Sequence, residues 1–336
     1  MSIEKTLIRL ADAVSIGNIK EASNIAEKQL SKYAEIIHTD NLGIIGRIKG
    51  KSDYTLMLEA HIDQIGFTVT DIDENGFLTV APLGGIDLRS LPSRQVDIHG
   101  KQMIRGVFCA TPPHLADSEV KYDNISDFKI DTCLGKQAKE IISIGDYVTF
   151  CTKAQSLIGD RLCGKSFDDR AGVTVLLELA KRFSTEEPPV NLVFCLSDAE
   201  ELGLRGAKTS AFAVTPDEAV AIDVSFGDGP EINPLDCGKL GKGVMIGISP
   251  VLNREISDKL ICLSNEKHIP YQTEVMGKST GTDADVISVT KSGVKTGLLS
   301  IPLRNMHTDC EIISLSDIKS VCDLLEVYIR GGGING

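Results

Sequence analysis

Several apolar runs of this 336-residue sequence lead directly into carboxylate or imidazole side chains, the groups that bind metal ions and transfer protons. The run 56–60, for example, leads into His61 and Asp63, and the run 192–196 leads into two adjacent glutamates. The candidate site residues are His61, Asp63, Asp168, Glu200, Glu201, Asp223 and His307. Ligands of open α/β sheets bind beyond the carboxyl ends of the strands, so these positions predict a shared site.

Two histidines among several carboxylates suit Zn, Co or Mn better than Ca²⁺ or Mg²⁺, which prefer oxygen ligands. Acidic side chains that gather at one place repel each other unless cations lie among them, so a metal site explains the pattern. If the strand continues past His61, Asp63 lies on the same face and can fix the imidazole tautomer. Each residue also has an ordinary structural interpretation: Asp168 suits a helix N-cap, and Glu200 and Glu201 suit a solvated loop. Spacing alone does not show that these distant residues meet.

The elements that carry these residues alternate between strand and helix after residue 168, which is typical of an α/β domain. Apolar runs predict strands at 34–38, 42–48, 54–60, 65–70, 190–196, 219–224, 271–275 and 295–301. Helical periodicity predicts helices at 3–14, 171–183, 204–212, 255–267, 283–291 and 317–329. Because runs such as 190–196 are apolar throughout, we expect a sheet that is covered on both faces.

Residues 71–157 show a different pattern, with short strands, frequent turns and no long amphipathic helix. Strands are predicted here at 77–81, 95–98, 103–109 and 147–151. We therefore expect a catalytic α/β domain formed by residues 1–70 and 158–336, split in the sequence by an inserted β-rich domain at 71–157.

Composition and charge argue against several classes of protein. The chain has 35 Lys and Arg against 47 Asp and Glu, and this net charge of −12 argues against binding to nucleic acid or to an anionic membrane. No apolar run approaches the ~20 residues that cross a bilayer. The N-terminal residues do not resemble a signal peptide, so we expect a cytoplasmic protein. The nine cysteines include no C-x-x-C pair, so a metal site would be built from His, Asp and Glu.

A competing motif lies at residues 159–166, which match the P-loop pattern G-x-x-x-x-G-K-[ST]. In an NTPase, Lys165 would bind the phosphates and Ser166 would bind Mg²⁺. The context disfavours this interpretation, because no apolar strand leads directly into the loop and Asp168 and Asp169 would lie near the phosphates. A P-loop NTPase remains a remote alternative.

The order and content of five segments provide a further argument. These are residues 58–67, 165–172, 200–207, 223–224 and 304–308, which include the sequences Glu-Ala-His-Ile-Asp-Gln and Glu-Glu-Leu-Gly-Leu-Arg-Gly-Ala. The series resembles the tetrahedral (TET) aminopeptidases, the group that includes glutamyl aminopeptidase and proteins labelled cellulase M. The resemblance implies an aminopeptidase-like α/β/α sandwich with a mixed central sheet. It also implies that the inserted domain is a small PDZ-like barrel used for dimerisation or oligomerisation.

The resemblance also implies roles for the candidate residues. Asp168 corresponds to a carboxylate that bridges two divalent ions, Zn or Co. His61 and Asp223 would complete the ligands of one ion, and Glu201 and His307 those of the other. Asp63 corresponds to the family's catalytic aspartate, and Glu200 to the general base that takes a proton from the attacking water. The expected partners are peptides with a free N-terminus and further copies of this chain, in a particle of twelve subunits.

Other functions remain open at this point. The same metal scaffold would serve another amide hydrolase, such as an N-acyl deacylase or a dipeptidase, and an inactive assembly component is a further alternative. A glycosidase has little support, because the chain has no Trp to form a sugar-binding platform and a glycosidase uses two carboxylates without metals. The preferred N-terminal residue, whether acidic, basic or apolar, is not evident from the sequence.

Overall fold

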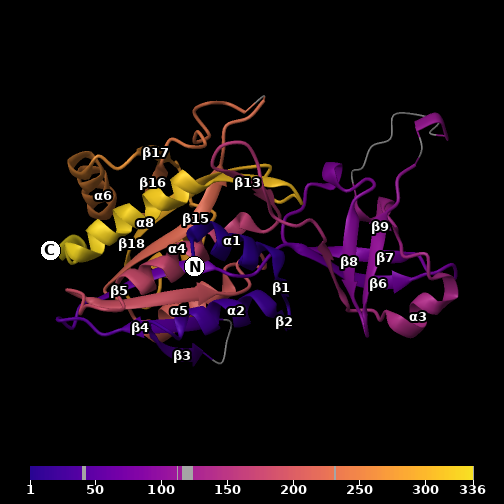
Figure 1. The fold of residues 1–336 in the computed structure, drawn as a ribbon, viewed down its shortest axis with the longest axis horizontal. Helices are drawn as coiled ribbons and strands as arrows, with labels where there is room; N and C mark the ends of the chain where they lie inside the picture. The colour runs from indigo at the N-terminus through magenta and orange to yellow at the C-terminus, as the bar shows by residue number, and fades with distance from the viewer. Residues whose placement is uncertain (40–42, 112, 116–123, 231, 336) are drawn as a thin grey trace.

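Helices cover both faces of a mixed β-sheet in the larger part of the molecule (Figure 1). The structure is a computed structural model that describes residues 1–39, 43–111, 113–115, 124–230 and 232–335. Along the sheet, the strands follow the order β12 (Gln155–Ser156), β13 (Arg161–Gly164), β19 (Glu311–Ser314), β18 (Lys295–Arg304), β15 (Glu218–Phe226), β5 (Thr55–His61), β14 (Asn191–Ser197), β4 (Gly43–Ile48) and β3 (Glu35–Thr39). β16 (Val244–Ile248) pairs with β18 and with β17 (Tyr271–Val275).

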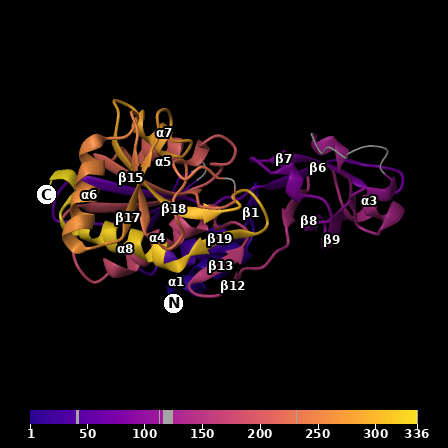
Figure 2. The ribbon, with the colours of Figure 1, turned by 90° about the horizontal axis from the view of Figure 1, so that it is seen from above.

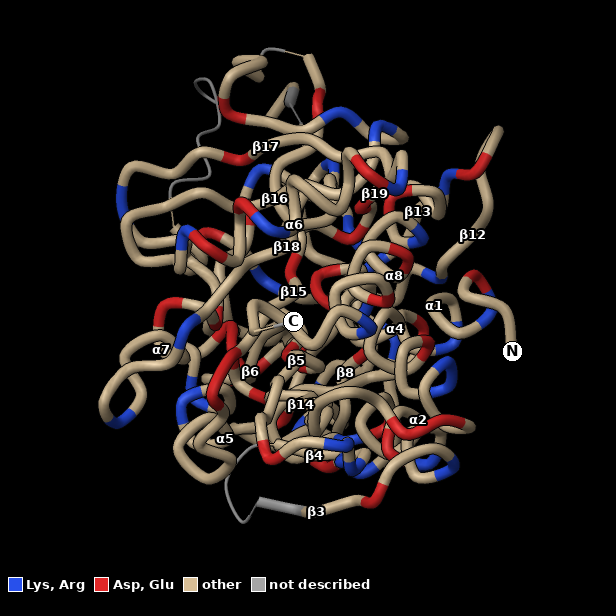
Figure 3. The backbone as a smooth tube through the Cα atoms, turned by 90° about the vertical axis from the view of Figure 1, so that its left-hand side faces the viewer, with Lys and Arg blue, Asp and Glu red and all other residues tan. Residues whose placement is uncertain are grey.

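The helices lie in layers on either side of this sheet (Figure 3). One layer contains α1 (Ile3–Asp12), α2 (Glu21–Leu30), α4 (Phe167–Arg182), α6 (Arg254–Lys267) and α8 (Leu315–Arg330). The other contains α5 (Arg205–Val214) and α7 (Ala284–Ser288). Successive side chains of β5 serve different cores, because Leu58 packs with the first layer and Met57 with the second. The predicted α/β/α sandwich with a mixed central sheet is therefore confirmed.

β1 (Ser15–Ile16) and β2 (Ile19–Lys20) pair as a separate two-stranded sheet. Six further strands form a closed barrel beside the sandwich (Figure 2). They are β6 (Gly66–Ile72), β7 (Leu78–Leu83), β8 (Gln95–His99), β9 (Met103–Phe108), β10 (Ile130–Asp131) and β11 (Tyr147–Phe150), and the short helix α3 (Ala138–Ile141) precedes the last. The barrel core includes Phe67, which packs edge-to-face on Phe108 and Phe150 with ring centroids 5.1 and 5.8 Å away. The expectation of a small β-rich barrel is confirmed. The predicted boundary at residues 70 and 71 falls within β6.

Some predicted elements differ from those observed. β13, β16 and β19 were not predicted, and the helix expected at 283–291 ends at Ser288. The P-loop interpretation is wrong, because residues 161–164 form β13 and pair with β19, so this backbone is not a loop that could surround a phosphate. Leu42, the first residue of a predicted strand, lies outside the described residues.

No helix within the described ranges combines enough residues with enough apolar character to cross a bilayer.

Candidate active site

Neighbouring strands of the central sheet carry the predicted site residues to one edge. His61 is the last residue of β5, and it lies opposite Ser197 at the end of the parallel strand β14. The chain that leaves β14 carries Glu200 and Glu201. Because parallel strands end at the same edge, the residues that follow β5 and β14 meet there.

The other predicted residues approach the same edge from different elements. Asp223 lies on β15, next to β5, although β15 continues beyond it to Phe226. His307 lies in the turn between β18 and β19. Asp168 lies at the start of α4, where its backbone (φ −73°, ψ 108°) departs from helical geometry before the regular helix begins.

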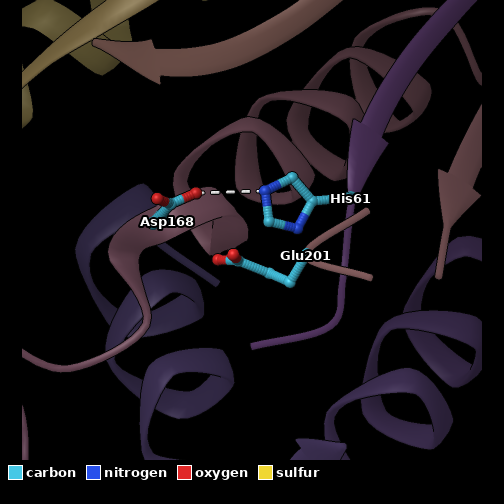
Figure 4. Close-up of side chains that lie close together, drawn as sticks. All are labelled: His61, Asp168 and Glu201. Carbon is cyan, nitrogen blue, oxygen red and sulfur yellow. Dashed lines mark hydrogen bonds and ion pairs between the residues drawn. The ribbon is translucent and has the colours of Figure 1, made fainter. Parts of the chain in front are cut away.

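The side chain of Asp168 stands between the two histidines. Its Oδ1 is 3.0 Å from Nε2 of His61, and its Oδ2 is 3.3 Å from Nε2 of His307. His61 Nε2 is also 3.9 Å from an oxygen of Asp223, and His307 Nε2 is 3.5 Å from an oxygen of Glu201. Figure 4 shows His61, Asp168 and Glu201 pointing toward one another, and one ligand atom of each lies within 4.8 Å of the others. The structure therefore brings five residues together that the sequence separates by up to 246 positions (307 − 61).

Asp63 lies on the opposite side of the His61 ring. Its Oδ1 is 3.4 Å from Nδ1 of His61, so Nε2 of that ring is directed at Asp168. The same carboxylate accepts the backbone N–H groups of Glu200 (3.0 Å) and Glu201 (3.3 Å). Asp63 thus joins the His61 ring to the segment that carries both glutamates.

Sequence reasoning missed Glu311, a buried carboxylate that holds two of these residues by their backbone. Its Oε2 accepts the N–H groups of Phe167 (2.7 Å) and Asp168 (3.3 Å), and its Oε1 accepts that of His307 (3.3 Å). In the sequence, Glu311 is a charged residue at the start of a short apolar run, four positions after His307. Its partners are distant in sequence, so its role could not be inferred.

The barrel also contributes to the site through the chain that follows β7. A Cβ atom on Gly84, which has a positive φ of 84°, would lie 2.9 Å from Oε2 of Glu201. A Cβ atom on Gly85 would lie 3.0 Å from Nδ1 of His307. Glycine at these positions lets the barrel backbone approach the site closely.

Charge within the site is unbalanced. Burial, with repulsion from Asp168, raises the pKa of Glu201 to about 8, and burial raises the pKa of Glu200 to about 7. Burial and nearby carboxylates raise the pKa of Asp223 well above its usual range. Burial alone would lower the pKa of His307, but the carboxylates of Asp168 and Glu201 outweigh it and raise the value to about 9. The carboxyl groups of the site also outnumber its two imidazoles, His61 and His307, which are the groups that can neutralise them.

These residues line a cavity of about 510 Å³ at the edge of the sheet. Its lining includes His61, Asp168, Glu200, Glu201, Asp223 and His307. Imidazole nitrogens and carboxylate oxygens are suitable ligands for Zn and related ions, and divalent ions would offset the surplus negative charge. The donor set therefore fits a metal centre.

Comparisons with known proteins identify the class. A putative aminopeptidase of Acetivibrio thermocellus is 32% identical over 317 residues, which cover 92% of each chain. The lysyl aminopeptidase of Pyrococcus furiosus is 30% identical over 310 residues, covering 90% of this chain and 88% of the relative. The TET1 peptidase of Pyrococcus horikoshii, which can assemble into a tetrahedron or a large octahedral shell, is 29% identical with a TM-score of 0.87. That alignment covers 98% of this chain and 99% of the other.

The fold is thus that of the TET aminopeptidases, as the five sequence segments indicated. Residues 43–324 match the M42 glutamyl aminopeptidase family, and this chain belongs to that family. It is a peptide-bond hydrolase of the exopeptidase class.

Proposed function

We propose that this chain is a metal-dependent aminopeptidase that uses two divalent ions, Zn or Co, to remove N-terminal residues from peptides. The observation that carries the proposal is the position of Asp168, whose two carboxylate oxygens each face a different imidazole, at 3.0 and 3.3 Å. A carboxylate placed in this way is suited to bridge two ions.

The surrounding residues supply further ligands in this proposal. His61 and Asp223 would hold one ion with Asp168, and Glu201 and His307 would hold the other. The distance of 3.9 Å between His61 and Asp223 supports the first group, and the distance of 3.5 Å between His307 and Glu201 supports the second. When bound, such ions polarise the scissile carbonyl and lower the pKa of the attacking water.

Glu200 is the proposed general base. It lines the cavity without forming an ion pair to either histidine among the described contacts, so its carboxylate is available to the reacting water. It takes the water proton and returns it to the nitrogen of the leaving peptide, a role that typically contributes 10²- to 10⁴-fold to the rate. Asp63 acts through His61 and through the backbone of Glu200, and is therefore a positioning residue.

A free substrate amine suits this cavity. Its surplus of carboxylates attracts the α-ammonium group of a peptide, whereas an acylated N-terminus carries no such charge. This difference favours an aminopeptidase over an N-acyl deacylase on the same scaffold.

Self-association is proposed as well. The TET1 peptidase resembles this chain over nearly its full length and can assemble into a tetrahedron or a large octahedral shell. This resemblance supports a large oligomer for this chain, and twelve subunits is the expected form. In this proposal residues 1–70 and 158–336 form the catalytic domain, and the inserted domain at 71–157 contributes to assembly.

A panel of aminoacyl p-nitroanilides tests the proposed activity, with each substrate also supplied in N-acetylated form. We expect release of p-nitroaniline from the free-amine substrates alone, loss of activity in EDTA, and recovery on adding Zn²⁺ or Co²⁺. Cleavage of the acetylated substrates at comparable rates would contradict the aminopeptidase mechanism and favour a deacylase. Full activity after chelation would contradict metal dependence.

A further inference from the structure

The cavity contains one more carboxylate, Glu274 on β17, for which the proposed mechanism has no role. Its Oε2 accepts a hydrogen bond from the hydroxyl of Ser300 at 2.7 Å, and its Oε1 accepts one from the hydroxyl of Ser225. Both carboxylate oxygens are therefore held by donors on the cavity wall. A side chain fixed in this way presents its charge at a defined place.

Strand pairing explains how Glu274 reaches the active-site cavity. Asp223 and Ser225 are two positions apart on β15, so their side chains share a face of the sheet. Ser300 on β18 is the register partner of Asp223 and lies on that face as well. β16 pairs with β18 and β17 pairs with β16, so Glu274 extends the same wall. The proposed metal ligand Asp223 and the additional carboxylate thus belong to one continuous surface.

No cation neutralises Glu274 within the described part of the chain. Neither Lys nor Arg is among the described residues that line the cavity, and the recorded partners of Glu274 are two neutral hydroxyls. Neutral hydrogen bonds orient a carboxylate but leave its charge uncompensated. A ligand that enters the cavity can therefore supply the positive charge.

The cavity lining also includes apolar side chains, beside the neutral residues 280–282. Met276 lies two positions beyond Glu274 on the chain, and Phe226 and Leu298 belong to the strands that carry its serine partners. Apolar surface beside a carboxylate that is held in place matches a side chain with a hydrocarbon stem and a cationic end. Lysine and arginine have this form, whereas glutamate would bring a second negative charge.

We propose that Glu274 forms the end of the subsite for the substrate's N-terminal side chain and gives the enzyme a preference for lysine or arginine at that position. The inference rests on the proposed aminopeptidase function and names its substrate class. Hydrogen bonds to charged groups contribute more than neutral ones, so the expected preference for lysine over an uncharged side chain of similar length is about 10- to 100-fold in kcat/KM.

The test compares p-nitroanilides of lysine, norleucine and glutamate, because norleucine retains the lysine stem and lacks its ammonium group. The native enzyme should favour lysine over norleucine by about 10- to 100-fold and cleave the glutamate substrate least. Glu274→Gln keeps the size of the side chain and its capacity to bond both serines. In this variant the ratio of kcat/KM for lysine to kcat/KM for norleucine should fall to about one. Glu255→Gln, which removes an exposed carboxylate on α6, is the matched control and should retain the native preference.

Two results would overturn the inference while leaving the proposed function intact. The native enzyme could cleave norleucine as well as lysine, or Glu274→Gln could lose activity equally on all three substrates. The second result would mean that Glu274 binds the α-ammonium group common to all of them. If the native enzyme cleaves no aminoacyl substrate with either metal present, the proposed function itself fails. A calorimetric comparison of lysinamide and norleucinamide binding gives a readout independent of turnover, and it should show the same loss of discrimination in Glu274→Gln.

Discussion

Replacing Glu200 with glutamine separates the proposed proton transfer from metal binding. The amide has nearly the same size as the carboxylate but cannot take up a proton at neutral pH. The backbone N–H of residue 200 would still donate to Asp63, because that hydrogen bond does not involve the substituted side chain. None of the close contacts that join Asp168 to the two histidines includes Glu200. We therefore expect the metal centre to persist in Glu200→Gln.

The expected loss in kcat is 10²- to 10⁴-fold, which corresponds to about 3 to 5 kcal/mol in the barrier. The assay is steady-state hydrolysis of an aminoacyl p-nitroanilide at saturating substrate, with metal content measured on the same sample. Glu255→Gln makes the same chemical change at an exposed position and should leave kcat unchanged. A kcat of Glu200→Gln within about tenfold of the native value, with native metal content, would refute the assignment of Glu200 as general base.

Three further substitutions test the structure that supports the site. Arg170 is fully buried and donates to the carbonyl of Leu10 at 2.8 Å. Arg170→Met leaves this buried acceptor without its donor, so it should reduce the free energy of unfolding by about 1 to 3 kcal/mol in urea titrations followed by circular dichroism, and an unchanged stability would contradict this role. A Cβ atom on Gly172 would lie 2.3 Å from an oxygen of Asp169. Gly172→Ala should therefore lower the free energy of unfolding by about 1 to 3 kcal/mol in the same titration. An unchanged free energy of unfolding would show that the carboxylate moves aside freely. Burial, with repulsion from Arg170, lowers the pKa of Lys165 to about 8. The charged form of Lys165 is thus disfavoured in the folded protein. Lys165→Met should therefore raise the free energy of unfolding by on the order of 2 kcal/mol below pH 8, and this gain should shrink as pH rises toward 10.5. A gain that does not vary with pH would contradict the explanation.

Local sequence patterns were sufficient to predict most of the sandwich. Strands such as β5 and β14 are continuous apolar runs, and such runs predict buried parallel strands without reference to other parts of the chain. β13 was missed because its four residues lie within a phosphate-loop motif, and all four pair with β19, about 150 residues later. Its formation is a tertiary effect that a local pattern does not contain.

The candidate site shows the same division. Polar residues after apolar strands identified His61, Glu200 and Glu201, because the edge at which parallel strands end is a general binding position. Their convergence with His307 depends on the packing of the whole sheet and could only be expected from the family resemblance. Glu311 acts through backbone groups of distant residues, and Gly84 acts by lacking a side chain, so neither role has a local signature.

The number of divalent ions bound per chain tests the central claim most directly. Protein stripped with EDTA, reloaded with Zn²⁺ or Co²⁺ and dialysed should contain two ions per chain by elemental analysis. His61→Ala and His307→Ala should each lose about one ion, since each histidine serves one proposed position. Asp168→Asn should lose the most metal, because its carboxylate faces both histidines. Native metal content in all three variants would contradict the proposed two-ion centre.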